Sequence, residues 1–414
     1  MREGFDNWDI DFEKVFPYYQ PILSADRLVP TYSHEVLGRY IDENGEICSL
    51  GAYFSSPDVS DSEALAVDQI IRKKALQEFA AAGCPGRLFI NIRLAWLLPY
   101  VDCPEKMPTI LWAKQFAIPP EKIVIEITEE EFISKGNVFL NVINYYRSWG
   151  CSIALDDFGN GASNIDRLVQ LRPDIVKIDM SYVHKSEKSH TYRMYLFALA
   201  SFIESFGIEV LYEGIETKQQ LNICLSSKGR FYQGFLLAKP GKHFVLESEC
   251  ECEFRDAFHY LFNTTQTKLE YSDKLCDMLD GSVISFVREN ILQSDYTDDE
   301  MDMYVVKMCE RIVCDLSGLS IRRMYISDTS GKQLTQNAEY EDNNIVLRNY
   351  RGSNWAWRSY FGQIISALGK GHVSCLSDTY RDFSTKEQVY TYACVCYDEC
   401  GQVYYVFTDV TYKE

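Results

Sequence analysis

The feature that most constrains the fold is a repeated alternation of short apolar runs with longer stretches of helical spacing, from about residue 16 to residue 240. The short runs are rich in β-branched residues, which favour strands. The stretches at 62–83, 137–150 and 192–207 have apolar residues at helical spacing and end in glycine, the usual residue after a helix C-terminus. Alternating strands and helices predict a parallel β/α architecture.

The apolar runs number eight, and each is a candidate strand: 16–23, 33–40, 88–92, 123–128, 152–158, 174–179, 209–215 and 232–238. Eight strands in about 225 residues fit a closed TIM (β/α)8 barrel better than an open sheet. Periodicity alone leaves the open sheet as an alternative.

The remainder of the chain has a different pattern. Residues 241–300 are polar, acidic and helical in spacing, which predicts a connecting helix or helix pair. After residue 300, alternating apolar and polar residues with turns at Ser-Gly and Glu-Cys-Gly predict antiparallel hairpins. We therefore expect an α/β chain with a barrel at 1–262, a helical linker at 263–300 and a smaller α+β domain at 301–414.

Charge and composition exclude several function classes. The net charge of −19 repels a phosphate backbone, so we expect no DNA or RNA partner. No stretch approaches the roughly 20 apolar residues of a membrane span, and the acidic start does not resemble a signal peptide. We expect a cytoplasmic protein with reduced cysteines. The pairs Cys250/Cys252 and Cys394/Cys396 are spaced too tightly for the usual zinc sites.

Nearly every expected barrel strand ends in a polar residue: Gln20, Glu35, Asn91, Glu126, Asp156 with Asp157, Lys177 with Asp179, Glu213 and Gln233. The carboxyl ends of barrel strands meet at one mouth, where barrel enzymes carry their chemistry. Several carboxylates that converge there repel one another and require cations.

Oxygen ligands of this kind favour Mg²⁺ or Mn²⁺ over zinc. Two such ions about 3.5–4 Å apart clamp a phosphate and activate a water. Lys177 is the one cation of the set and could orient or deprotonate that water. The pattern predicts a phosphodiester hydrolase.

Taken together, the strand-end motifs resemble the EAL family of c-di-GMP phosphodiesterases. The resemblance rests on motifs in the family's order over about 225 residues: YQPI (19–22), EVLGR (35–39), FINI with Asn91, EITEEE (126–131), DDFGNGASN (156–164), VKIDMSYV (176–183), YEGIET (212–217) and YQGFLLAKP (232–240). The isolated DFG string also occurs in protein kinases, but no kinase catalytic loop or glycine-rich loop accompanies it.

The resemblance implies a modified barrel with one antiparallel strand, hydrolysis of c-di-GMP to linear pGpG, and a homodimer. It implies that Lys177 positions or activates the hydrolytic water, that Glu35 and Gln233 are also catalytic, and that Glu216 anchors the loop after DDFG. The implied metal ligands are Glu35, Asn91, Glu126, Asp156, Asp157 and Glu213. The implied contacts to the dinucleotide are Gln20, Arg39, Asp179 and Gln233.

The chain departs from the family pattern in a few places. In the namesake motif, Val36 replaces the usual alanine, and Gly38 stands where a bulkier apolar residue is common. Tyr212 stands where a small residue is usual. Ala162 and Asn164 replace a usual Tyr and Ser in the loop after DDFG. No implied metal ligand is lost. Two hypotheses stay open: an active phosphodiesterase regulated by its C-terminal domain, and a c-di-GMP receptor with little turnover.

The segment after residue 300 resembles PAS- or Cache-like sensor domains, as in a Gram-positive subgroup of EAL proteins. Such domains line a small-ligand pocket with aromatic and arginine side chains. The candidates here are Trp357, Arg358, Tyr360 and Asp409. The alternative is that the aromatic residues Trp355, Trp357 and Phe361 are simply core.

Overall fold

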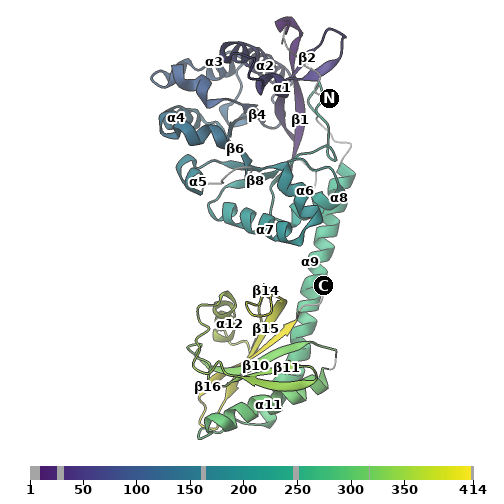
Figure 1. Cartoon of the computed structure of the whole chain (residues 1–414), viewed down its shortest axis with the longest axis vertical. Coiled ribbons are helices and arrows are strands. Elements are labelled where there is room, and N and C mark those ends of the chain that lie inside the picture. The colour runs from purple at the N-terminus through teal and green to yellow at the C-terminus, as the bar shows by residue number, and fades with distance from the viewer. Residues whose placement is uncertain (1–9, 26–31, 160–164, 246–250, 317, 412–414) are drawn as a thin grey trace. The chain divides into compact units, whose positions relative to one another are not determined.

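The computed structural model describes residues 10–25, 32–159, 165–245, 251–316 and 318–411, without the side chains of 129–137, 167, 251 and 252. The chain divides into two compact units, 1–263 and 264–414 (Figure 1).

The first unit is a closed eight-stranded barrel, as predicted. Around the barrel the strands follow the order β1 (Val15–Ser24), β9 (Phe231–Tyr232), β8 (Glu209–Tyr212), β7 (Ile175–Ile178), β6 (Ser152–Phe158), β5 (Ile123–Thr128), β4 (Leu88–Asn91) and β2 (Tyr32–Ile41). The pairing of β1 with β2 closes the ring, which excludes the open sheet, and β3 (Ile47–Ser49) extends β2 outward. Strand β1 is antiparallel to both its neighbours, and the other barrel pairs are parallel.

The helices of this unit are α1 (Gly51–Phe54), α2 (Asp61–Ala81), α3 (Pro108–Gln115), α4 (Glu129–Trp149), α5 (Ile165–Leu171), α6 (Met180–Lys188), α7 (His190–Ser205) and α8 (Lys218–Ser226). Local sequence sets several ends. Ser60 and Glu63 form a capping box at the start of α2, and Thr217 and Gln220 form one at the start of α8. Gly150 ends α4 in the left-handed conformation.

The last barrel strand is much shorter than predicted. The sequence predicts a strand over 232–238, but β9 ends at Tyr232 and the chain then turns. Gly234 lies so close to the chain after β8 that an added Cβ would be 2.1 Å from the Ile215 oxygen. This backbone contact replaces further strand pairing, because the backbone amide of Ile215 donates to the carbonyl oxygen of Gln233.

A layer of apolar side chains forms a core cluster of its own at the strands, and its members come one from each of seven strands: Ile22, Phe89, Val124, Ala154, Ile175, Leu211 and Phe231. In each parallel strand of this set, a polar residue lies two positions after the apolar one. In the order of the strands along the chain, these polar residues are Asn91, Glu126, Asp156, Lys177, Glu213 and Gln233. In antiparallel β1 the direction is reversed, and Gln20 lies two positions before Ile22. Side chains two residues apart share one face of a strand. The polar side chains therefore form the next layer, toward the mouth.

The second unit is built on an antiparallel sheet in the order β12 (Asn344–Arg348), β11 (Asn337–Glu341), β10 (Ile321–Asp328), β16 (Val403–Thr411), β15 (Gln388–Tyr397) and β13 (Ser374–Leu376), with β14 (Tyr380–Arg381) also paired to β15. Its helices are α10 (Ser285–Glu289), α11 (Asp298–Asp315) and α12 (Ser359–Gly369). Helix α9 (Glu251–Leu279) contains the boundary between the units and continues into a π-helical turn, Asp280–Ile284.

Alternating residues of this sheet face two different helices. On β10, Met324 and Ile326 belong to the cluster that contains the buried side chains of α11, whereas Tyr325 belongs to the cluster that contains those of α12. Val406 and Phe407 divide in the same way on β16. The period of two thus gives the sheet two covered faces.

Candidate functional site

The site at the barrel mouth is centred on Lys177 of β7. Its side chain is 1% exposed, and its Nζ atom lies 2.6 Å from Glu213 Oε1, 2.7 Å from Glu126 Oε1, 3.1 Å from Asp156 Oδ1 and 3.8 Å from Glu35 Oε1. We call these five residues the mouth cluster. Four different strands or strand ends supply the carboxylates, so the convergence predicted from the sequence is present.

The electrostatics of the mouth cluster are unbalanced. Burial acts against the charged form of Lys177, but the four carboxylates outweigh it and raise its pKa well above the usual value. Burial also raises the pKa of Glu126 well above its usual value and that of Glu213 to about 8, although Lys177 opposes both shifts. One ammonium group faces four carboxylates, which leaves an excess of acceptors.

Neighbouring amides fix the carboxylate of Glu35. Asn91 Nδ2 donates to its Oε1 at 2.9 Å, and Gln233 Nε2 donates to its Oε2 at 2.7 Å. Gln20 is the cross-strand partner of Glu35 in the β1–β2 register, and its buried side chain lines the same cavity. This cavity of about 280 Å³ also contains Lys177 in its wall.

The residue types around Lys177 suit divalent cations. Asp156, Asp157 and Glu213 each place a carboxylate oxygen within 4.8 Å of the others, close enough to share one ion. Of the two carboxylate oxygens of buried Glu126, Oε1 lies 2.7 Å from Lys177 Nζ, and Oε2 has no hydrogen-bond partner among the described residues. An unpartnered carboxylate oxygen at this depth fits a hard metal ion.

Three of the residues singled out by the sequence, Asp157, Asp179 and Arg39, lie outside the lining of the cavity, and a fourth, Glu216, lies at its rim. Asp157 is an exposed residue in the left-handed region (φ +56°), and desolvation of its carboxyl group, with Asp156 adjacent, raises its pKa to about 6. Asp179 caps α6 by accepting from the Ser181 amide at 2.9 Å. Arg39 lines a neighbouring cavity together with Asn91, donates to the Gly38 oxygen and lies over the ring of Tyr18. Glu216 is exposed at the cavity rim.

The family departures that fall on described residues are structural. A Cβ on Gly38 would lie 2.7 Å from Ile71 Cδ1 and 3.1 Å from Leu50 Cδ1, so these neighbours fill the space of a larger side chain. Tyr212 is fully buried and donates from its hydroxyl to the Ser227 oxygen at 2.8 Å. Ala162 and Asn164 lie outside the described residues.

His34, next to Glu35 in the sequence, is packed rather than placed in the mouth. It is fully buried, accepts from the Val245 amide at 3.0 Å and contacts the ring of Phe244 edge-on. Burial lowers its pKa to about 4, so it is neutral.

Sequence reasoning missed several residues that line the mouth cavity: Met180, Gly214, Gly234 and Phe235. Phe235 is 56% exposed, a large apolar side chain beside an otherwise polar site. Its position two residues after Gln233 could have indicated that Phe235 lies at the mouth. The predicted extension of the last strand to 238 obscured it.

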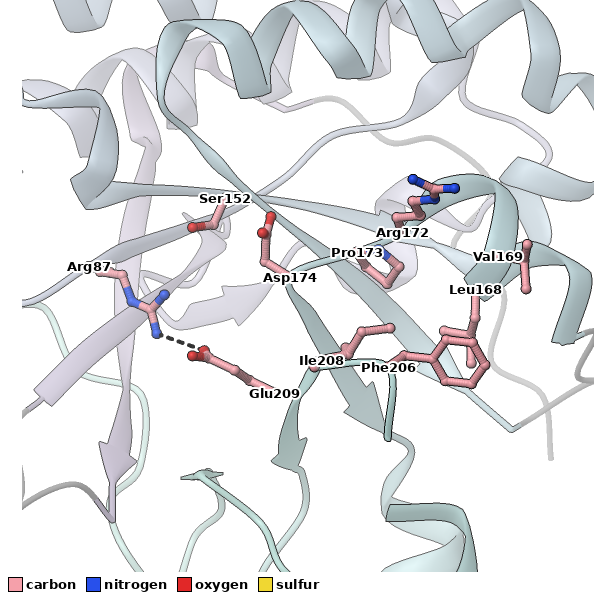
Figure 2. A pocket seen from close by; sticks show the side chains of 11 residues that line it. Arg87, Ser152, Leu168, Val169, Arg172, Pro173, Asp174, Phe206, Ile208 and Glu209 are labelled. Carbon is pink, nitrogen blue, oxygen red and sulfur yellow. Dashed lines mark ion pairs between the residues drawn. The ribbon is translucent and has the colours of Figure 1, made fainter. Parts of the chain in front are cut away.

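A larger cavity, of about 640 Å³, lies where β6, β7 and β8 begin, at the end of these strands opposite to the mouth (Figure 2). Arg87 and Glu209 form an ion pair of 3.7 Å at one side, and Val169 and Phe206 line the other. Since barrel chemistry resides at the opposite end of the strands, we do not assign this cavity to the active site.

The candidate sensor residues occupy one region of the second unit. Arg358, Tyr360 and Asp409 line a cavity of about 130 Å³. Trp357 lies outside that lining and is 66% exposed, stacked on Phe383. Phe361 belongs to the hydrophobic core of this unit, as expected if the aromatic residues only pack. Trp357 does not belong to that core.

None of the described helices combines the length and apolar character needed to cross a membrane.

Comparison with known proteins identifies the family. A model of the EAL domain matches residues 9–240, and a model of an EAL-domain associated signalling protein domain matches residues 244–414. The EAL-domain containing protein YkuI of Bacillus subtilis (strain 168) is 31% identical over 411 residues, which cover 97% of this chain and 96% of YkuI. The cyclic di-GMP phosphodiesterase RocR of Pseudomonas aeruginosa is 30% identical over 133 residues, 32% of this chain and 34% of RocR.

Among solved structures, the crystal structure of the Bacillus subtilis YkuI protein, in complex with substrate c-di-GMP and calcium, matches with a TM-score of 0.82 and 29% identity over 98% of both chains. The similarity therefore extends over both units. The chain belongs to the EAL domain family and carries the signalling domain associated with that family.

Proposed function

We propose that the barrel hydrolyses c-di-GMP to linear pGpG with the help of two divalent ions, Mg²⁺ or Mn²⁺. The observation that carries this proposal is the mouth cluster, in which one buried lysine contacts four carboxylates from different strands. Two relatives add support, because RocR is named a cyclic di-GMP phosphodiesterase and YkuI was crystallised with c-di-GMP and calcium.

In this proposal the metal ions are held by Glu35, Asn91, Glu126, Asp156, Asp157 and Glu213. When bound, the ions neutralise phosphate charge and supply a water of lowered pKa as the nucleophile. Lys177 then keeps its proton, since the carboxylates stabilise the ammonium form, and it orients that water and offsets charge that develops on the phosphate.

Other side chains position the reactants. Gln233 uses its Nε2 to hold Glu35, and its buried Oε1 accepts no hydrogen bond from described residues, so this oxygen is suited to a water or substrate donor. We assign Gln20, Arg39 and Asp179 to the dinucleotide. Arg39 would exchange its bond to the Gly38 oxygen for a phosphate, which its planar fork of donors fits.

Regulation is the second part of the proposal. We assign the second unit to a PAS- or Cache-like sensor that binds a small ligand and changes the rate of hydrolysis in the barrel. We also propose a cytoplasmic homodimer in which α5 takes part. Its Ile165 and Val169 are 54% and 49% exposed, and α5 directly follows the loop 160–164 that Glu216 would anchor.

The test of the proposed reaction is an assay of the purified full-length protein with c-di-GMP and Mn²⁺ or Mg²⁺, with products separated by chromatography. We expect pGpG to form with either ion and to disappear with excess EDTA. Tight binding without pGpG would establish the receptor instead. Absence of binding would reject both functions.

The dimer has its own test. Ile165→Asp combined with Val169→Asp should shift the protein from dimer to monomer in light scattering after size exclusion, because each places a charge in a buried apolar contact. The matched control is Leu111→Asp, since Leu111 is 47% exposed on α3. An unchanged mass for the α5 variant would reject this interface.

A further inference from the structure

The cavity of the second unit, which we call the C-terminal pocket, lies on the sheet face that α12 covers. Asp409 of β16 is two residues after Phe407, whose side chain packs in the cluster that contains α12, so both face the same way. The pocket has a volume of about 130 Å³. It carries four charged side chains, Arg323, Arg358, Asp382 and Asp409, and their arrangement indicates the chemistry of its ligand.

The charges on one side of the pocket leave a negative excess. Arg323 pairs with Asp382 Oδ2 at 2.8 Å and with Asp409 Oδ2 at 3.2 Å. One guanidinium thus serves two carboxylates. Asp409 is 3% exposed, and its other oxygen accepts from the Thr391 hydroxyl at 2.7 Å. A carboxylate offers about four lone-pair sites, so Asp409 can accept a further donor.

The second arginine, Arg358, forms no ion pair within 4.0 Å with a described carboxylate, although its charge opposes the burial-driven rise in the pKa of Asp409. The guanidinium of half-buried Arg358 lies 4.2 Å from the ring centroid of Phe383, 5.0 Å from Tyr380 and 5.4 Å from both Tyr360 and Trp357. No acidic group among the described residues lies within ion-pair distance of it. The surrounding rings hold the guanidinium in place and leave its charge available to an anion.

The remaining walls are aromatic. Tyr360 and Tyr380 stack at 4.9 Å, and Tyr325 and Tyr360 approach through their hydroxyl oxygens at 3.3 Å. The volume is comparable to the ~150 Å³ of a cavity that accepts benzene. The part of a ligand that the pocket encloses therefore has on the order of six to eight non-hydrogen atoms.

We propose that the C-terminal pocket binds a free α-amino acid of small size, with its carboxylate on Arg358 and its ammonium group on Asp409. A zwitterion matches the two opposite excess charges at once, whereas a simple carboxylate or a simple amine leaves one of them without a partner. This inference rests on the proposed sensor role of the second unit. It does not require that the barrel hydrolyse c-di-GMP.

The experiment is isothermal titration of the full-length protein with L-alanine, L-serine and L-valine, together with the single-charge analogues propionate and isopropylamine. We expect saturable binding of at least one amino acid, and binding at least about tenfold weaker for both analogues, because each lacks one charge-assisted contact. Failure of all three amino acids to bind, or equal binding of propionate, would overturn the proposal.

Variants locate the site. Arg358→Gln should weaken amino acid binding at least about tenfold, and Asp409→Asn should do the same if that variant folds. The matched control is Arg381→Gln, since Arg381 is exposed on β14, next to Tyr380 of the pocket wall. Equal affinity of the Arg358 variant and the wild type would overturn the assignment. If amino acids bind but do not change pGpG formation in an active enzyme, the regulatory role fails and the binding site stands.

Discussion

Lys177 provides the sharpest test of how the mouth cluster is held together. Lys177→Met keeps the length of the side chain and removes its charge. In the metal-free protein, four carboxylates then lose the one ammonium group that lies 2.6 to 3.8 Å from them. If divalent ions belong at this site, they should replace the missing positive charge.

The magnitude follows from the burial of the cluster. Removal of one partner from a buried ion pair costs about 3–5 kcal/mol, because it leaves an uncompensated charge. The carboxylates can reduce this cost by taking up protons, since burial has already raised the pKa of Glu126 and brought that of Glu213 to about 8. We therefore expect a loss of about 3–5 kcal/mol at pH 8 and a smaller loss at pH 6.

The assay is urea unfolding of wild type and variant, each in EDTA and in excess Mn²⁺. The variant should regain most of its lost stability with Mn²⁺, and its hydrolysis of c-di-GMP should fall at least about 100-fold because the water loses its orienting group. The control is Lys228→Met. Lys228 pairs with Glu204 at 2.8 Å in an exposed position, so its removal should cost less than about 1 kcal/mol.

Two results would refute this reasoning. A loss of less than about 1 kcal/mol in EDTA would mean that Lys177 does not balance the carboxylates. An equal loss with and without Mn²⁺ would mean that divalent ions do not bind where the lysine charge acts.

Three further predictions concern the same site. Asp156→Ala should abolish pGpG formation and weaken Mn²⁺ binding measured by titration, because it removes a carboxylate of the mouth cluster; normal turnover would show that the site is misassigned. The pKa of Glu213 is about 8 in the folded chain and near 4.3 when unfolded. The free energy of unfolding of the metal-free wild type should therefore fall by up to about 1.4 kcal/mol per pH unit as the pH rises through this range. Unfolding curves in EDTA that do not change with pH would contradict this prediction. Gly234→Ala places a Cβ 2.1 Å from the Ile215 oxygen and should lower the free energy of unfolding by about 1–3 kcal/mol. The same clash should displace Gln233 and slow the hydrolysis of c-di-GMP. An unchanged rate would show that the backbone relaxes without moving the Gln233 side chain.

The sequence was sufficient for the strand–helix alternation and for the composition of the mouth, because both depend on local periodicity, whereas the pairing of β1 with β2 decided that the sheet closes into a barrel. A residue two positions beyond an inward apolar side chain must share its face. Asn91, Glu126 and Lys177 follow Phe89, Val124 and Ile175 in this way. The eight apolar runs therefore determined both the strands and the polar layer above them.

Partners distant in the sequence were decided only by the tertiary structure. Gln233 and Glu35 are 198 residues apart, and no local sequence pattern predicts that the Gln233 amide donates a hydrogen bond to the Glu35 carboxylate. The end of β9 at Tyr232 depends on the approach of Gly234 to the chain after β8, so the apolar run 233–238 was wrongly predicted as strand.

The same distinction holds for individual side chains. The sequence placed Asp179 at the end of a strand, and the resemblance to sensor domains placed Arg358 among the candidate ligand-binding residues. The structure shows that Asp179 caps a helix and that Arg358 is surrounded by rings from α12, β14 and the segments beside them. Periodicity fixes which way a side chain points, whereas its partners depend on which distant segments the closed barrel and the second sheet bring beside it.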